Sequence, residues 1–103
     1  MKRLELYKKI IKAVLGREIA DGRKREDVAA RMCLAYQLHE DGYTSGQVGK
    51  MIGRDHATVL HMIKMMDACR TYPKSNRIEC DMWDEFQSML NQNYIINGTE
   101  VYR

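Results

Sequence analysis

Proline, aromatic residues and long apolar runs are scarce in this sequence of 103 residues. The single Pro, Trp and Phe, beside many Leu, Ile, Met, Lys, Arg and Glu residues, favour helices over strands. The apolar stretches cover only a few residues, so we expect no membrane-spanning segment and no signal-peptide core. The length argues for one domain, because doubly wound nucleotide-binding folds and barrel enzymes need roughly 150 to 250 residues.

Cysteine is scarce too, and its spacing matches no familiar metal or disulfide pattern. Cys33, Cys69 and Cys80 are odd in number and form neither a CxxC pair nor a zinc knuckle. We therefore expect reduced thiols in a cytoplasmic protein and no disulfide scaffold. His56 and His61 lie five residues apart, which on a helix turns them about 140° away from each other. We expect no metal site and no cofactor.

The net charge of +3 conceals an uneven distribution. Residues 1–78 carry 16 basic and nine acidic side chains, a balance of +7, whereas residues 79–103 carry −4. A basic body is what a polyanion-binding domain needs, although a solvated helical surface has the same composition. In the acidic segment, Trp83 and Phe86 are expected to anchor the last helix. The alternative for this segment is a dimer contact or a lid over the basic face.

Apolar residues at three- and four-residue steps predict five helices in a single domain of residues 1–92. The expected bounds are about 2–16, 27–40, 44–52, 55–70 and 79–92. The basic stretch 20–25 is predicted to be a loop. Residues 93–103 have no clear period and are expected to form a C-terminal tail, either flexible or with a small strand from Tyr94 to Ile96. The predicted fold class is an all-α bundle of about five helices.

Residues 44–70 have the parts of a helix-turn-helix, namely a short helix, a turn at glycine and a longer helix. Thr44 or Ser45 is expected to cap the short helix. Gly49 falls where the two helices would cross, and Gly53 falls at the turn, where a positive φ costs glycine least. At steps of three and four residues, the inner face of the longer helix is predicted to contain Val59, Met62, Ile63 and Met66. The same pattern also fits an αα-hairpin that only packs.

Two stretches of the sequence resemble a known family. The run from Gly53 to His61, GRDHATVLH, resembles the signature GRDHTTVLHA in the DNA-binding domain of DnaA, the bacterial chromosomal replication initiator, and differs only at Ala57. Thr44 through Gly49 resembles the S-L-P-E-I-G segment of that family, and the basic residues 23–25 followed by Arg31 resemble its basic loop and the next helix. The resemblance implies a helix-turn-helix bundle of the DnaA C-terminal or Trp-repressor-like kind.

The resemblance also implies sequence-specific binding of double-stranded DNA, with the loop arginine in the minor groove and the start of the second helix in the major groove. Carried over to this sequence, the minor-groove residue is Arg23 or Arg25. The expected base contacts come from Asp55, His56, Ala57, Thr58 and, near a thymine methyl, Leu60. The expected phosphate contacts come from Arg31, Lys50 and Arg54. The remaining candidate DNA-binding residues are Thr44, Ser45, His61 and Lys64.

These 103 residues contain no GxxxxGK[ST] loop, so we expect no counterpart of the DnaA ATPase in them. No nucleophile is placed beside either histidine of the second helix in a way that predicts catalysis, so we expect no enzyme. A regulator or accessory replication factor of a bacterium, phage or mobile element fits these expectations. The alternative is a helical protein–protein interaction module, an inhibitor or adaptor of a replication or transcription protein, without DNA binding. A homodimer is also open.

Overall fold

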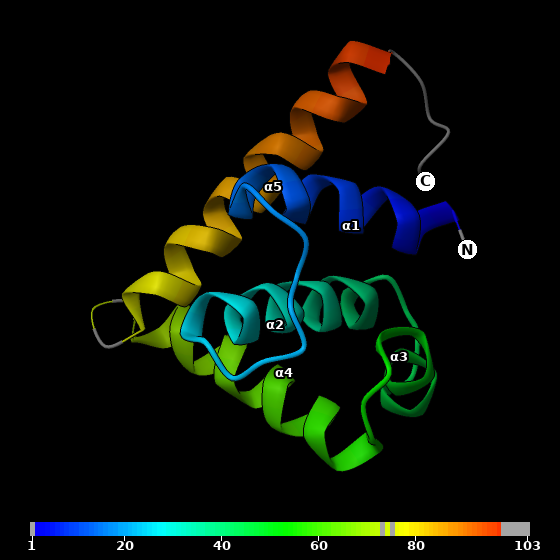
Figure 1. Cartoon of the computed structure of the whole chain (residues 1–103), viewed down its shortest axis with the longest axis vertical. Coiled ribbons are helices and arrows are strands. Elements are labelled where there is room, and N and C mark those ends of the chain that lie inside the picture. Colours follow the sequence, from blue (N-terminus) through cyan, green and yellow to red (C-terminus); the bar gives the residue numbers. More distant parts are fainter. Residues whose placement is uncertain (1, 73, 75, 98–103) are drawn as a thin grey trace.

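In the part of the chain that the structure describes, all regular elements are helices. The computed structural model describes residues 2–72, 74 and 76–97, and of residues 2 and 93–97 only the backbone. The helices, shown in Figure 1, are α1 (Lys2–Leu15), α2 (Arg25–Glu40), α3 (Ser45–Ile52), α4 (His56–Thr71) and α5 (Arg77–Asn97). The predicted all-α class with five helices is confirmed. No helix among these is long and apolar enough to cross a membrane.

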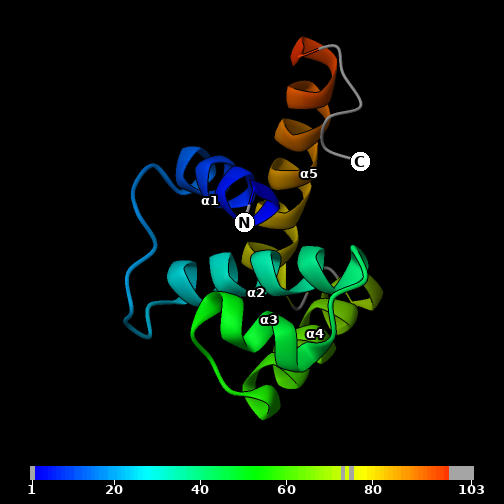
Figure 2. The same cartoon turned by 90° about the vertical axis from the view of Figure 1, so that its right-hand side faces the viewer.

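The central element of the bundle is α2. It lies between a layer formed by α1 and α5 and a layer formed by α3 and α4 (Figures 1 and 2). Ala29, Ala30 and Ala35 are fully buried, and their small side chains let the neighbouring helices approach α2 closely. Leu34 and Leu38 fill the remaining space. Because α2 is covered on most of its circumference, it connects the two layers through one core.

Aromatic side chains anchor α5 to the body, as the sequence indicated. Phe86 is fully buried, and its ring lies edge-on to the ring of Tyr7 in α1 at a centroid distance of 5.8 Å. The ring of Trp83 lies edge-on to Tyr36 in α2 at 5.2 Å. Edge-to-face pairs of this kind contribute about 0.5 to 1.5 kcal/mol beyond the area they bury. These contacts attach α5 to both α1 and α2.

The last helix is longer than predicted. α5 runs to Asn97, so the expected strand from Tyr94 to Ile96 is wrong and the helix takes in the first five residues of the predicted tail. The physical reason is that no glycine or proline interrupts the chain between Arg77 and Asn97, and the first helix breaker is Gly98. Residues 98–103, the rest of the predicted tail, lie outside the described residues.

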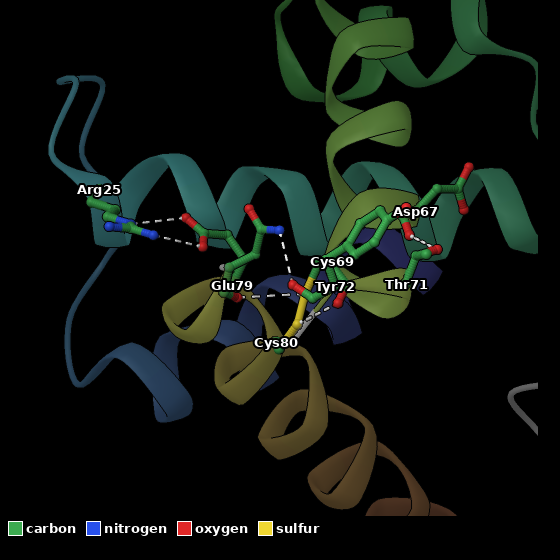
Figure 3. Close-up of a disulfide and its surroundings, with 8 residues drawn as sticks. Arg25, Asp67, Cys69, Thr71, Tyr72, Glu79 and Cys80 are labelled. Carbon is green, nitrogen blue, oxygen red and sulfur yellow. Dashed lines mark hydrogen bonds and ion pairs between the residues drawn. A yellow bond between two sulfur atoms is a disulfide. The ribbon is translucent and has the colours of Figure 1, made fainter. Parts of the chain in front are cut away.

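The expectation of three reduced thiols is wrong for two of them. Cys69, near the end of α4, and Cys80, near the start of α5, are joined by a disulfide (Figure 3). The turn between these helices brings the two Cα atoms to 5.8 Å, a separation typical of disulfides. Cysteine count and spacing did not reveal this pair because the helix-to-helix turn brings the residues together. Cys33 is free and buried, and desolvation raises the pKa of its thiol to about 12.

Candidate nucleic-acid interface

The short helix α3 begins with a capping box. The Thr44 side chain accepts a hydrogen bond from the backbone N–H of Gln47 at 3.1 Å, and the Gln47 side chain accepts one from the backbone N–H of Thr44 at 2.9 Å. These two bonds satisfy backbone donors that a helix start leaves without partners. Thr44 is therefore the cap of the two candidates, and its hydroxyl oxygen serves α3.

The turn before α4 approaches α3 closely at Gly49. The backbone N–H of Arg54 donates to the carbonyl of Gly49 at 2.9 Å. A Cβ atom at Gly49 would lie 2.5 Å from the carbonyl oxygen of Arg54, closer than real Cβ atoms approach. Gly53 has a φ of +72° and ends α3 in the left-handed conformation. The predicted turn at Gly53 is confirmed, whereas the close neighbours of Gly49 are backbone atoms of the turn at Arg54 and Asp55 and not of α4.

Asp55 forms the N-terminal cap of α4. Its carboxylate accepts a hydrogen bond from the backbone N–H of Thr58 at 2.8 Å. Hydrogen bonds from the Thr58 side chain and backbone lower the pKa of Asp55, which keeps the carboxylate charged at the positive end of the helix. One oxygen of the carboxylate expected to contact a base is therefore engaged in holding the first turn of α4.

The solvent-facing side of α4 matches the predicted reading surface. Val59, Met62 and Met66 are buried and Ile63 is half-buried, as the helical period predicts. Thr58 is half-buried at the first turn. The exposed side chains on this helix include His56, Ala57, Leu60, His61 and Lys64. The first three turns of α4 therefore present a mixed polar and apolar surface to solvent.

Ser45 is placed differently from the expected DNA contact. It is the first residue of α3 and only 9 % exposed. Its Oγ lies 2.9 Å from Nδ1 of His56, the first residue of α4. Ser45 thus contacts one of the predicted reading residues, and no signal in the sequence pairs the two.

Arg31 is a second residue with a different placement. It is 8 % exposed, and its guanidinium donates to the carbonyl oxygens of Ala20 at 2.7 Å and Gly22 at 2.8 Å. These bonds hold the loop between α1 and α2 in place and leave little of the guanidinium for a ligand. Arg31 therefore anchors the loop in this structure, and its expected phosphate contact stays a prediction.

Asp27 fastens the same loop from the start of α2. Its buried carboxylate accepts hydrogen bonds from Arg17 at 2.7 and 3.1 Å and from the backbone N–H of Ala20 at 2.9 Å. The Arg17 hydrogen bond, followed by that of Ala20, lowers the pKa of Asp27 to about 2. Hydrogen bonds to Asp27 and from Arg31 therefore hold the basic loop of residues 20–25 against α2.

The two candidate minor-groove arginines differ in their surroundings. Arg25 is the first residue of α2, and its Nε and Nη2 donate to the Glu79 carboxylate of α5 at 3.1 Å each (Figure 3). Glu79 is only 7 % exposed, and the hydrogen bond from Arg25 lowers its pKa. Arg23 is exposed and makes no hydrogen bond or ion pair with any described residue. Both arginines are exposed, and Arg23 is the one without an ion-pair partner among the described residues.

Loop and helix-turn-helix lie side by side. Arg54, in the turn before α4, forms an ion pair with Asp21 of the loop at 3.3 Å. A cavity of about 200 Å³ lies between the two segments, lined among others by Lys8, Arg31, Arg54 and Ile52. Lys50 is exposed on α3. The predicted loop, turn and reading helix therefore form one continuous region.

The acidic segment does not cover this region. α5 lies on the far side of α2 from α3 (Figures 1 and 2). Its buried acidic residue, Glu79, is engaged with Arg25, and Asp81, Asp84 and Glu85 are exposed. Within the described residues α5 forms no lid over the basic face, which is one of the two alternatives to anchoring, and Glu79 helps to dock the last helix.

Comparisons with protein families, with curated proteins and with solved structures find no match to this chain. The DnaA resemblance of residues 44–61 stays a prediction from the sequence, and the functional proposal depends on the geometry of the site.

Proposed function

We propose that this protein binds double-stranded DNA with sequence preference through α3 and α4. The observation that carries the proposal is the exposed first half of α4, which follows a turn packed closely on α3 at Gly49 and lies next to the basic loop. An α-helix fits the major groove of B-DNA, and in a helix-turn-helix the N-terminal residues of the second helix meet the base edges. The surface of α4 has the chemistry that this contact needs.

In this proposal the side chains divide into base readers and phosphate contacts. His56 and Thr58 supply hydrogen-bonding groups, and Ala57 and Leu60 supply apolar surface suited to thymine methyl groups. The exposed cations Lys50 and Lys64 neutralise phosphates and release counterions, and Arg54, half-buried beside Asp21, adds a third positive charge at the turn. Arg23, on the loop beside the turn, is positioned for the adjacent minor groove.

The biological role that we propose is a regulator or accessory replication factor that reads DNA without an ATPase of its own. Support for this role comes from the DnaA-like signature in residues 53–61, which lies at the turn and the first half of α4. The proposal assigns no catalytic residue, because the site is explained as a binding surface.

Selection of bound duplexes from a random pool, followed by titration of the selected sequence at several salt concentrations, tests the function. We expect a preferred sequence and a logarithm of affinity that falls linearly with the logarithm of salt concentration. His56→Ala and Thr58→Ala should reduce the preference, whereas Lys50→Ala should weaken all duplexes alike and flatten the salt slope by about one unit. Lys74→Ala, in the turn before α5, is the control and should change neither quantity. Absence of binding at low salt would refute the proposal.

A further inference from the structure

Ser45 and His56 form the only side-chain hydrogen bond between α3 and α4 among the described residues. The two residues open their helices, so the bond connects the two helix starts across the turn. Ser45 is 9 % exposed, while His56 is exposed on the surface proposed to face DNA. A buried hydroxyl is thus in contact with a side chain that is free to meet a ligand on its other edge.

The position of the hydroxyl hydrogen follows from burial. A serine hydroxyl has one hydrogen to donate, and a buried donor without an acceptor costs about 1 to 3 kcal/mol. Among the described residues, Nδ1 of His56 is the one acceptor within hydrogen-bonding distance of Ser45 Oγ. Donation from this hydroxyl to Nδ1 satisfies its hydrogen within the protein, and it requires the tautomer in which Nδ1 carries no hydrogen. In a neutral imidazole only one ring nitrogen carries hydrogen, so that hydrogen is on Nε2.

We propose that Ser45 is a positioning residue that makes Nε2 of His56 a hydrogen-bond donor toward the DNA base edge. This inference rests on the proposed function. In the major groove a donor finds acceptors on guanine (N7 and O6), adenine (N7) and thymine (O4), whereas cytosine presents its N4 amino donor. Ser45 thereby selects against cytosine at the base that His56 contacts, without touching DNA itself.

The tautomer is measurable in the protein without DNA. Two-bond ¹H–¹⁵N correlation spectra of the imidazole nitrogens at a pH where the ring is neutral should show His56 in the Nε2–H form. Ser45→Ala should shift the ring toward a mixture of tautomers, and Ser45→Thr, which keeps a hydroxyl, should retain the wild-type pattern. Ser88→Ala, an exposed serine on α5, is the matched control, and His56→Gln assigns the signals. An unchanged tautomer in Ser45→Ala would overturn the proposal.

The second readout is base preference. We expect the discrimination against cytosine at one position of the selected site to fall about fivefold in Ser45→Ala, the equivalent of one ordinary hydrogen bond. The preferences at other positions should be retained, as should the whole site in Ser45→Thr and Ser88→Ala. Wild-type binding with a preferred sequence that Ser45→Ala leaves intact would overturn this inference alone. A wild-type protein that binds no DNA would overturn the proposed function and the base selection together, and the spectra would still show whether Ser45 sets the tautomer.

Discussion

Replacing Gly49 with alanine should destabilise the protein, although alanine is normally the better helix former. A Cβ at this position would lie 2.5 Å from the carbonyl oxygen of Arg54, while ordinary contact begins at 3.4 Å. The two atoms must therefore separate by about 0.9 Å, and because the obstacle is backbone, the whole turn before α4 has to move.

The magnitude is a difference between two opposing effects. Overpacking of this kind costs about 1 to 3 kcal/mol. The higher helix propensity of alanine offsets up to about 1 kcal/mol of that cost. We expect the free energy of unfolding to fall by about 1 to 2 kcal/mol in Gly49→Ala, measured by urea denaturation. Because the start of α4 moves with the turn, affinity for the selected duplex should also fall.

Gly46 provides a matched control in the same helix. A Cβ at Gly46 meets only the Thr44 hydroxyl oxygen, at 4.0 Å, and its φ is not in the left-handed region. Gly46→Ala should therefore leave stability unchanged or raise it by up to about 1 kcal/mol. If Gly49→Ala were as stable as Gly46→Ala, the close approach of the Arg54 carbonyl to Gly49 would be refuted.

Three further outcomes are expected. The pKa of Asp27 is about 2 in the folded protein, against about 3.9 in an unfolded chain. The contribution of Asp27 to stability is therefore present above about pH 4 and is lost as the pH falls toward 2. In urea unfolding from pH 2 to 5 the wild type should lose its advantage over Asp27→Asn as the pH falls, and a constant difference would contradict this. Arg25→Ala should lower the melting temperature less in a Glu79→Gln background than in the wild type, and additive effects in this double-mutant cycle would count against the ion pair. Dithiothreitol should lower the free energy of unfolding by up to about 3 kcal/mol, because it removes a cross-link between two cysteines 11 residues apart in the sequence. It should have no effect on a variant with Cys69 and Cys80 both changed to serine. An unresponsive wild type would argue against the disulfide.

The helix-turn-helix could be predicted because its determinants are local. Apolar spacing of three and four residues identified the buried side of α4, and the glycine at 53 indicated the turn. Helical periodicity also places Ala57, His61 and Lys64 on the side opposite the buried residues, and all three are exposed. Each of these properties depends on residues within about one helical turn of each other, which a single sequence displays directly.

The partners of the charged residues could not be predicted in the same way. Arg25 and Glu79 are separated by 54 positions, and Arg54 and Asp21 by 33. Their contacts arise from helix packing and loop path, which leave no periodic signal in the chain. Arg31 shows the consequence most clearly. The DnaA resemblance implies that it contacts a phosphate, whereas in the fold it is buried and anchors a loop.

The same contacts change the meaning of the charge asymmetry. The sequence divides into a basic body and an acidic end, which suggested that the end could mask the body. In the fold, the acidic end contributes Glu79 to an ion pair that binds Arg25, and α2 separates α5 from α3. Arg25 at the start of α2 is thereby paired with a carboxylate although its side chain stays 55 % exposed, and Arg23 in the loop and Lys50 on α3 are exposed as well. The acidic segment therefore balances one positive charge at the start of α2 and leaves the first half of α4 uncovered.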